Sequence, residues 1–314
     1  MVALHEAPAA VWTHRHLLDI DALSRADLDR VLAVATEMRD RRGTDAVRDL
    51  LQNEIVGLAF YEGSTRTRVS FELAARDLGA TVVDLSIAGS SVAKGESLVD
   101  TLRTLERAGV TMLVLRHGAS GAPYLASRTT RMRIINGGDG LHAHPTQALC
   151  DALTLRDALG GADGRTILIV GDVAHSRVAR SNLHALRITG FTVRVAGPPS
   201  FVAGMAAWPG VSVAPTIEEA LSGADAVMAL RIQVERAAAS GIPSVSEYVE
   251  RWGLTEERLE LARPGAVVLH PGPTNEGIEV TAALANGPRS LIARQVEWGV
   301  PVRMAVMGLL AGAV

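Results

Sequence analysis

Two hydroxyl residues and two arginines alternate in the short segment STRTR, residues 64–68. The segment follows an apolar run, residues 55–60, and precedes a helical pattern of apolar residues. Ser64 can cap that helix, which leaves the backbone N–H groups of the first turn unpaired at the positive end of the helix dipole. Hydroxyl and guanidinium donors beside those groups would complete a phosphate site. Taken alone, the segment fits a capped helix start with solvated arginines equally well.

Four more cations stand beside the ends of candidate strands. They are Lys94, Arg116, Arg177 and Arg231. Each by itself could be a solvated residue, but open α/β sheets bind ligands at the carboxyl ends of their strands. The formal net charge of the chain is −3, so these cations are a local concentration of positive charge. Together with Arg66 they predict a cleft for a small, highly anionic substrate.

The segment HPTQ places His144 and Gln147 at the start of a further helical pattern. A lone histidine is more often structural than catalytic. His142 precedes His144 closely, but no cluster of carboxylates or thiols accompanies the pair, so we expect no metal site. The segment GDVAHS (171–176) lacks two glycines of the dinucleotide fingerprint, and the sequence has no P-loop. We therefore expect no organic cofactor either.

The composition argues against several classes of protein. A net charge of −3 disfavours general binding of nucleic acid or of an acidic membrane, which needs a basic face. The single cysteine, Cys150, rules out an internal disulfide framework and a cysteine-based zinc site, and it is typical of a reducing compartment. Residues 1–20 lack the unbroken apolar core of a secretory signal and read as a short, loosely ordered leader. We expect a cytoplasmic protein that does not cross a membrane.

The elements that must position these residues alternate between apolar runs and helical patterns. Runs that are apolar on both faces are typical of parallel sheets covered by helices. Between two such runs, Phe71, Ala74, Ala75 and Leu78 recur at helical spacing. The predicted fold class is therefore α/β, with doubly wound parallel sheets. The predicted strands are residues 55–60, 81–87, 111–115, 133–136, 166–170, 192–196, 225–230 and 266–270.

The predicted strands fall into two equal groups, and the segment that begins with HAHPTQ (142–147) separates them. We interpret this segment as a helix that joins two α/β domains. The first domain is predicted to comprise residues 1–145 together with about 290–314, and the second domain residues 146–289. The apolar residues 304–314 predict a packed C-terminal helix that returns to the first domain.

The order and spacing of the motifs make the chain recognisable. The chain resembles the catalytic chains of the aspartate branch of the aspartate/ornithine carbamoyltransferase family. The motifs that carry the resemblance are STRTR, KGES, RH, HPTQ, GD with SR, and LRIQVER. The resemblance covers nearly the whole chain, from about residue 15 onward. STRTR and HPTQ indicate the wider family, and LRIQVER indicates its aspartate branch. An ornithine-using relative would be expected to show a cysteine-leucine-proline segment where this chain has HPGP.

The resemblance implies transfer of the carbamoyl group of carbamoyl phosphate to the amino group of L-aspartate. The products would be N-carbamoyl-L-aspartate and phosphate, in pyrimidine biosynthesis. The catalytic residues implied are Arg66, Thr67, Lys94, Arg116 and His144. The substrate-binding residues implied are Ser64, Thr65, Arg66, Thr67, Ser90, Lys94, Arg116, His144, Gln147, Arg177, Arg231, Gln233, Gly272 and Pro273.

The family pattern also implies the role of each group of residues. Residues 64–67 would hold the phosphate of carbamoyl phosphate. Thr67, Arg116 and His144 would donate hydrogen bonds to its carbonyl oxygen, and Gln147 would bind the carbamoyl amide. The departing phosphate can accept the proton of the amine, so this chemistry needs no metal, covalent nucleophile or organic cofactor.

Arg177, Arg231 and Gln233 resemble the residues that bind the two carboxylates of aspartate. Ser90 and Lys94 correspond to a mobile loop that reaches into the active site of a neighbouring subunit. The resemblance therefore implies a homotrimer with shared active sites. It leaves open a regulatory chain or a dihydroorotase as a further partner.

This sequence departs from the family pattern at two positions. Glu276 stands where many relatives carry an arginine, and Gly118 stands where they carry a proline. We interpret Glu62, Arg68 and Glu96 as supporting ion pairs, with Glu96 as a partner for Arg66. Because Glu276 reverses a charge near the aspartate loop, a carbamoyltransferase for another amino acid remains an alternative. A noncatalytic scaffold subunit and an NAD-dependent dehydrogenase fit less well, since the site residues are present and the glycine fingerprint is missing.

Overall fold

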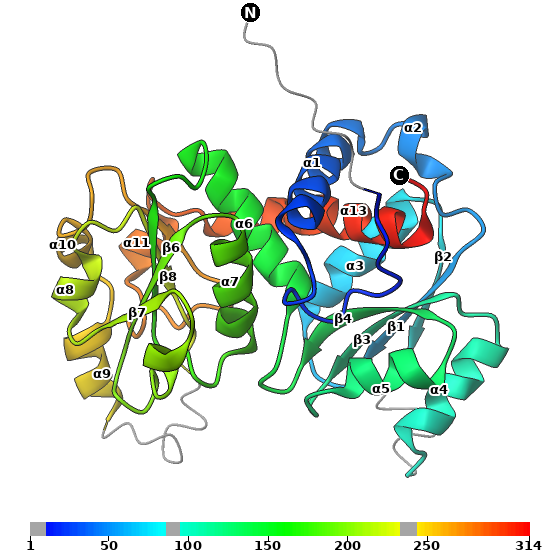
Figure 1. The fold of residues 1–314 in the computed structure, drawn as a ribbon, viewed down its shortest axis with the longest axis horizontal. Helices are drawn as coiled ribbons and strands as arrows, with labels where there is room; N and C mark the ends of the chain where they lie inside the picture. The colour runs from blue at the N-terminus through cyan, green and yellow to red at the C-terminus, as the bar shows by residue number, and fades with distance from the viewer. Residues whose placement is uncertain (1–10, 86–94, 233–243) are drawn as a thin grey trace, which may run out of the picture. The chain divides into compact units, whose positions relative to one another are not determined.

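The computed structural model describes residues 11–85, 95–232 and 244–314, and the chain divides into two compact units. The first unit comprises the residues up to Asp139 together with Gly299–Val314, and the second unit is Gly140–Trp298. Each unit is built on its own sheet of parallel strands, with helices on both faces (Figure 1). The predicted α/β fold class with doubly wound parallel sheets is confirmed.

In the first unit the strands follow the order β2-β1-β3-β4. Their bounds are β1 Ile55–Phe60, β2 Thr81–Leu85, β3 Met112–His117 and β4 Arg133–Asp139. The helices are α1 Arg25–Arg41, α2 Asp45–Arg48, α3 Thr65–Asp77, α4 Leu98–Arg107, α5 Ala122–Thr129 and α13 Gly299–Ala311. Figure 1 shows α4 and α5 on one face of this sheet and α1, α3 and α13 on the other. The sheet is therefore covered by helices on both sides, as its apolar strands require.

The prediction of a loosely ordered leader over residues 1–20 is wrong for the second half of that segment; its first half lies outside the described residues. The N–H of Leu17 donates to the carbonyl of Ile134 at 2.9 Å, and the N–H of Asn136 donates to the carbonyl of Leu17 at 2.9 Å. Leu17 and Ile20 are fully buried. The physical reason is that β4 is an edge strand, whose unpaired backbone groups can bind another extended segment.

In the second unit the strands follow the order β7-β6-β5-β8-β9. Their bounds are β5 Thr166–Val170, β6 Thr192–Ala196, β7 Val211–Ala214, β8 Ala226–Ala229 and β9 Val267–Leu269. The sequence predicts only four of these five strands, because β7 is missing from the prediction. β7 is a short edge strand, and only its last residue, Ala214, is buried. It therefore lacks the continuous apolar run that marks a strand buried on both faces.

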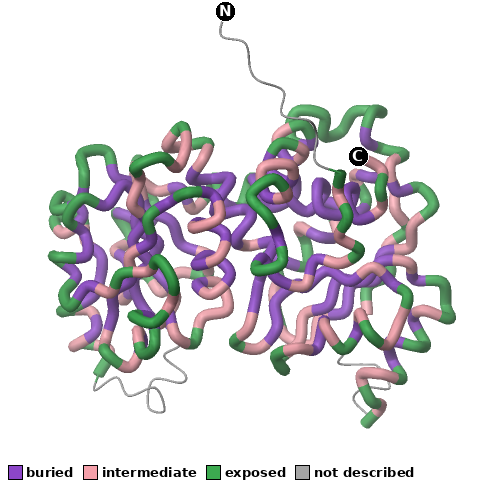
Figure 2. The backbone as a smooth tube through the Cα atoms, in the orientation of Figure 1, coloured by how far each residue is buried: buried purple, intermediate pink, exposed green. Residues whose placement is uncertain are grey.

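The helices of the second unit are α6 Pro145–Leu159, α7 Arg177–Ile188, α8 Ile217–Leu221, α9 Val245–Trp252, α10 Glu256–Leu259, α11 Ala282–Asn286 and α12 Ile292–Glu297. They cover two separate apolar clusters. One contains Phe201 and Tyr248, and the other contains Leu183 and Phe191. Figure 2 shows the buried strands inside each unit and the exposed segments around them. The core thus leaves the loops at the strand ends available for binding.

The two helices predicted near the domain boundaries are both present. α13 is buried from Gly299 to Leu310 and packs against α1 and α3, so the chain returns to the first unit as predicted. The predicted linking helix is α6, and the structure assigns it to the second unit. It ends at Gly160, whose φ of 73° is a left-handed conformation that favours glycine. Within the described residues, no helix combines the length and apolar character needed to span a membrane.

Candidate functional site

The STRTR segment lies where β1 ends and α3 begins. Ser64 is the residue before α3, but its side chain makes no capping hydrogen bond, contrary to the prediction. Its backbone angles are φ −163° and ψ 89°, whereas Ser97, which does cap a helix, has φ −71° and ψ 151°. The first hydrogen bond of the helix joins the N–H of Arg68 to the carbonyl of Ser64 at 3.0 Å. The N–H groups of residues 65–67 therefore have no acceptor within α3, and the Ser64 hydroxyl is not engaged in the cap.

The side chains on the first turn of α3 differ in their surroundings. Thr65 and Arg66 are exposed, whereas Thr67 is buried. Arg68 forms an ion pair with Asp84 of β2, with Nη1 and Oδ2 2.8 Å apart. The predicted supporting ion pair of Arg68 is thus present. Arg66, exposed on the first turn of α3, is available to bind an anion at the helix N-terminus.

Arg116 lies near the end of β3, beside the loop that leads into α3. It stands opposite Phe60 in the parallel register, and the N–H of Tyr61 donates to its carbonyl at 2.9 Å. Its side chain is mostly buried: Nη1 donates to the carbonyl of Gly137 at 3.1 Å, and Nε lies 3.8 Å from Oε2 of Glu62. The pairing of β1 with β3 therefore brings Arg116 next to the STRTR loop.

The groups around Arg116 set the charge of this region. Glu62 is the ion-pair partner of Arg116, which supports its predicted structural role. Burial raises the pKa of the Tyr61 phenol, and the negative charge of Glu96 raises it further, so Tyr61 stays neutral at physiological pH. A Cβ atom at Gly118 would lie 3.5 Å from Oε1 of Glu62, an ordinary contact. The space at Gly118 therefore does not require a glycine.

In the second unit, His144 directly precedes α6. It is buried, and its N–H donates to Oγ of Ser181 on α7 at 2.9 Å. One turn later, Nε2 of Gln147 donates to Oδ1 of Asp151 at 2.9 Å. These contacts fix the start of α6 against α7 and hold the side chain of Gln147 in one orientation.

The two arginines predicted to bind carboxylates follow neighbouring strands of the second sheet. Arg177 begins α7 after β5, and its Nη1 donates to the carbonyl of Gly140 at 3.3 Å. Arg231 follows β8, which pairs directly with β5. The loop after β9 joins this region, because Nδ2 of Asn275 donates to the carbonyl of Ile232 at 2.9 Å. Parallel strands thus place both arginines at the same edge of the sheet.

The loop after β9 contains the remaining predicted residues of the second unit. The Gly272–Pro273 peptide bond is cis, and the N–H of Gly272 donates to Nδ1 of His270 at 2.8 Å. Glu276, the charge reversal relative to the family pattern, is exposed in this loop. The predicted residues that lie outside the described part of the chain are Ser90, Lys94 and Gln233.

The predicted site residues that the structure describes form two clusters, one in each unit. Residues 64–67 and Arg116 are adjacent in the first unit. In the second unit the starts of α6 and α7 contact each other through His144 and Ser181. Among the described residues, no group of three or more His, Cys, Asp and Glu side chains is placed to hold a metal ion.

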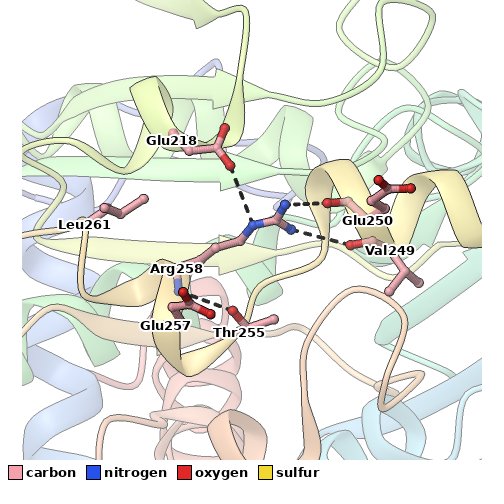
Figure 3. A pocket seen from close by; sticks show the side chains of 7 residues that line it. All are labelled: Glu218, Val249, Glu250, Thr255, Glu257, Arg258 and Leu261. Carbon is pink, nitrogen blue, oxygen red and sulfur yellow. Dashed lines mark hydrogen bonds and ion pairs between the residues drawn. The ribbon is translucent and has the colours of Figure 1, made fainter.

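A pocket of the second unit is lined by other residues, from α8, α9, α10 and the segments beside them (Figure 3). Arg258 points toward the end of α9 and donates to the carbonyls of Val249, Glu250 and Gly253. Its Nε lies 3.7 Å from a carboxylate oxygen of Glu218. Because these contacts satisfy the last carbonyls of a helix, we assign Arg258 a structural role.

Two family models match consecutive parts of the chain. The aspartate/ornithine carbamoyltransferase carbamoyl-P binding domain matches residues 15–157, and the Asp/Orn binding domain of the same family matches residues 163–310. The chain belongs to the aspartate/ornithine carbamoyltransferase family. The resemblance predicted from the motifs is thereby confirmed.

Individual carbamoyltransferases match over nearly the full length. The aspartate carbamoyltransferase catalytic subunit of Gluconobacter oxydans is 50% identical over 301 residues, which cover 95% of this chain and 96% of the relative. The corresponding subunit of Sorangium cellulosum is 48% identical over 303 residues, with coverages of 96% and 94%. The similarity of sequence therefore extends over both units.

Solved carbamoyltransferase structures share the fold. Aspartate transcarbamoylase from Trypanosoma cruzi, in complex with carbamoyl phosphate and aspartate, aligns with a TM-score of 0.85 and 30% identity over 96% of this chain and 98% of that chain. Ornithine carbamoyltransferase from Thermus thermophilus aligns with a TM-score of 0.84 and 28% identity, with coverages of 95% and 99%. Because the aspartate and ornithine enzymes align almost equally well, the fold alone does not choose the second substrate.

Two polar residues connected to the predicted site are not among the residues predicted from the sequence. Asp151 binds the side chain of Gln147, and Gln295 binds Asp151. For Asp151 a signal was present, because a carboxylate four residues after Gln147 interrupts an otherwise apolar stretch of helix. Gln295 comes from a distant part of the chain, and nothing in the local sequence marks it.

Proposed function

We propose that this chain is an aspartate carbamoyltransferase, which transfers the carbamoyl group of carbamoyl phosphate to the amino group of L-aspartate. The observation that carries the proposal is the identity of about one half to catalytic subunits of that name over nearly the whole chain. The segments LRIQVER and HPGP support aspartate over ornithine as the second substrate. Cations at the strand ends would offset the charges of one phosphate and two carboxylates.

In this proposal the first unit binds the phosphate. The N–H groups of residues 65–67 and the Ser64 hydroxyl donate to the phosphate oxygens, and Arg66 supplies a full positive charge. Thr67 and Arg116 donate to the carbonyl oxygen of the carbamoyl group. Support for these roles comes from the adjacency of Arg116 to the STRTR loop.

The second unit then supplies the remaining contacts. His144 donates to the same carbonyl oxygen, and Gln147 accepts from the carbamoyl amide. Arg177, Arg231 and Gln233 bind the carboxylates of aspartate, and the Gly272–Pro273 segment lines the aspartate site. The adjacency of β5 and β8, which places both arginines at one edge of the sheet, supports this assignment.

The reaction follows from these contacts. The neutral amino group of aspartate attacks the carbamoyl carbon, and a C–N bond forms while negative charge develops on the carbonyl oxygen. The C–O bond to phosphate then breaks, and the departing phosphate accepts the proton of the amine. Donors fixed toward the carbonyl oxygen lower the barrier, because they stabilise the oxyanion more than the neutral carbonyl. Holding both substrates in reactive geometry lowers it further.

A carbamoylation assay tests the proposal. Purified protein and carbamoyl phosphate are incubated with L-aspartate, L-ornithine, L-glutamate or buffer alone. We expect N-carbamoyl-L-aspartate and phosphate with aspartate only. Turnover of another amine would retain the carbamoyl phosphate site but replace the second substrate, with Glu276 as the first position to examine. No turnover with any amine would favour a noncatalytic subunit.

We also propose that the active unit is a homotrimer with shared active sites. The proposal rests on the correspondence of Ser90 and Lys94, which lie outside the described residues, to a loop that reaches a neighbouring subunit. Val69 and Leu73 give additional support, since they lie one turn apart on α3 and remain 43% and 39% exposed. An apolar face of this kind is available for contact with another chain.

Mixing two inactive variants tests the shared site. Lys94→Ala and Arg231→Ala chains are each expected to be inactive, because each lacks one part of the site. After dissociation and reassembly together, some trimers contain a site with both residues intact, and activity is expected to return. Failure to regain activity in mixed trimers verified by native mass spectrometry would contradict sharing between chains.

A cytoplasmic location agrees with the cysteine content. Cys150 is the only cysteine of the sequence, and it is buried and forms no disulfide. Proteins without disulfides are typical of reducing compartments.

A further inference from the structure

Asp151 lies in a buried polar network of the second unit that the proposed reaction does not use directly. Its side chain is fully buried in α6. Its Oδ1 accepts from Nε2 of Gln147 at 2.9 Å and from Nε2 of Gln295 at 2.7 Å, and its Oδ2 accepts from Nδ2 of Asn182 at 2.8 Å. The donors belong to α6, α12 and α7. A buried carboxylate with several hydrogen bonds is a rigid point to which other side chains can be fixed.

The contact with Asp151 determines which end of the Gln147 amide is presented to a ligand. The NH₂ group of an amide donates hydrogen bonds, and its oxygen accepts them. Because both carboxylate oxygens of Asp151 act as acceptors, the NH₂ group of Gln147 must face them. Its Oε1 is then directed away from Asp151. The NH₂ group of a carbamoyl substrate requires such an acceptor. If the Gln147 amide were flipped, its own NH₂ group would face the NH₂ group of the substrate, and no hydrogen bond could form.

Gln295 anchors this orientation to the backbone. Its Oε1 accepts from the N–H of His270 at 2.9 Å, and its Nε2 donates to Asp151 at 2.7 Å. A backbone N–H can only donate, so the Gln295 amide has one acceptable orientation. The direction of the hydrogen bonds is therefore set from His270 through Gln295 and Asp151 to Gln147.

The same network continues into the loop after β9. Nδ1 of His270 accepts from the N–H of Gly272 at 2.8 Å, so Nε2 carries the ring hydrogen and donates to Oε1 of Glu279 at 3.1 Å. Oε1 of Glu279 also accepts from the N–H of Asn275 at 2.6 Å, and Asn275 binds the carbonyl of Ile232. Hydrogen bonds thus connect Gln147 to the loop that contains Gly272 and to Ile232, which follows β8.

We propose that Asp151 is a positioning residue for carbamoyl transfer, which holds Gln147 with its oxygen toward the carbamoyl NH₂ group. The assignment rests on the proposed function, because it requires a carbamoyl substrate. Gln295 is the second positioning residue, because it holds Asp151 at a fixed place relative to the loop after β9. Asp151 itself has no contact with substrate in this proposal; its effect passes through Gln147.

A double-mutant cycle tests this role. The variants are Asp151→Ala, Gln147→Ala and the double variant, with Asp151→Asn as the conservative replacement. In Asp151→Asn the side-chain oxygen can still accept from Gln147 and Gln295. Its new NH₂ group can donate to Oδ1 of Asn182 once the Asn182 amide rotates, so this variant should stay within about 3-fold of the unmodified chain. Asp151→Ala should lower kcat/KM for carbamoyl phosphate by about 10- to 100-fold, the effect of misplacing a binding group. In the Gln147→Ala background, the same change should cost less than about 2-fold.

A matched control on the same helix is Thr154→Val. Thr154 is fully buried, and its hydroxyl donates to the carbonyl of Cys150 at 2.7 Å. This variant should lower the thermal unfolding midpoint while kcat/KM stays within about 2-fold, because only a local hydrogen bond is lost. If Asp151→Ala does not fold, Asp151→Ser replaces it, since a hydroxyl can satisfy one of the buried donors.

The outcomes separate the two proposals. If the unmodified chain forms no carbamoyl-aspartate, the proposed function is wrong and the role of Asp151 fails with it. If the unmodified chain is active but the losses in kcat/KM from Asp151→Ala and Gln147→Ala are independent of each other, Asp151 is only structural. An Asp151→Asn variant as impaired as Asp151→Ala would also overturn the assignment, because a neutral acceptor would then be unable to orient Gln147. The assignment is supported if the effects of Asp151→Ala and Gln147→Ala are strongly non-additive and Asp151→Asn keeps its activity.

Discussion

An Arg66→Ala variant is expected to lose about 100- to 1,000-fold in kcat/KM for carbamoyl phosphate while it keeps its fold. Arg66 is exposed on the first turn of α3, so its removal leaves no buried group without a partner. Its guanidinium supplies a full charge to the proposed phosphate site, where the helix N–H groups provide only partial charges. Loss of one preorganised donor to a charged transition state commonly costs this much. Initial rates with varied carbamoyl phosphate at saturating L-aspartate measure the effect.

Arg68→Ala is the matched control for this prediction. It removes the same side chain two residues later on the same helix, where Arg68 pairs with Asp84 and is 46% exposed. The variant should keep kcat/KM within a few-fold and should lose less than about 1 kcal/mol of unfolding free energy, because exposed ion pairs contribute little. Equal losses in the two variants would indicate a general effect of charge. Near-normal activity of Arg66→Ala would contradict the phosphate assignment.

An Arg116→Lys variant is expected to lose about 100-fold or more in kcat. The Arg116 guanidinium has several donors in fixed directions: Nη1 binds the carbonyl of Gly137, and Nε faces Glu62. In the proposed reaction another donor binds the developing oxyanion. A lysine keeps the charge but offers a single nitrogen, so it cannot retain the backbone contact and reach the substrate oxygen together. The loss should fall mainly on kcat, since the interaction strengthens in the transition state.

Arg133→Lys is the matched control in the same sheet. Arg133 begins β4, at the amino edge of the sheet, and its Nη1 lies 3.0 Å from both carboxylate oxygens of Glu54. The replacement should lower the thermal unfolding midpoint slightly and leave kcat within about 2-fold. Full activity in Arg116→Lys would show that charge alone suffices at the end of β3 and would remove Arg116 from the oxyanion site.

Much of the fold can be predicted from local pattern. β1, β5 and β6 agree with the predicted ranges at both ends. β1 and β5 are apolar runs buried along most of their length, and in β6 the apolar residues Val193, Val195 and Ala196 are buried. β7 escapes prediction, since it is short and only one of its residues is buried. Leu17 escapes for a different reason: a single extended segment gains its hydrogen bonds from an edge strand more than a hundred residues away, and the local sequence contains no sign of that partner.

The candidate site divides in the same way. The positions of residues 64–67 and Arg116 at strand ends follow from the alternation of strands and helices, since parallel strands all end at one edge of a sheet. The capping role predicted for Ser64 does not occur: its backbone has φ −163° and ψ 89°, and its side chain makes no capping hydrogen bond. Such a conformation depends on the packing of the whole loop, which a five-residue motif does not specify.

The sequence by itself determined the class of fold, the family and the set of cations from which an anion site is built. These follow from periodicity, from charge and from motifs that are each contiguous in the chain. Only the tertiary structure decided how the polar side chains are oriented. The amide of Gln147 has two ends of nearly equal shape, and Asp151 and Gln295 select one of them through hydrogen bonds that begin at a backbone N–H of His270. Directional contacts between residues distant in sequence arise only when the chain is folded, so no local pattern can encode them.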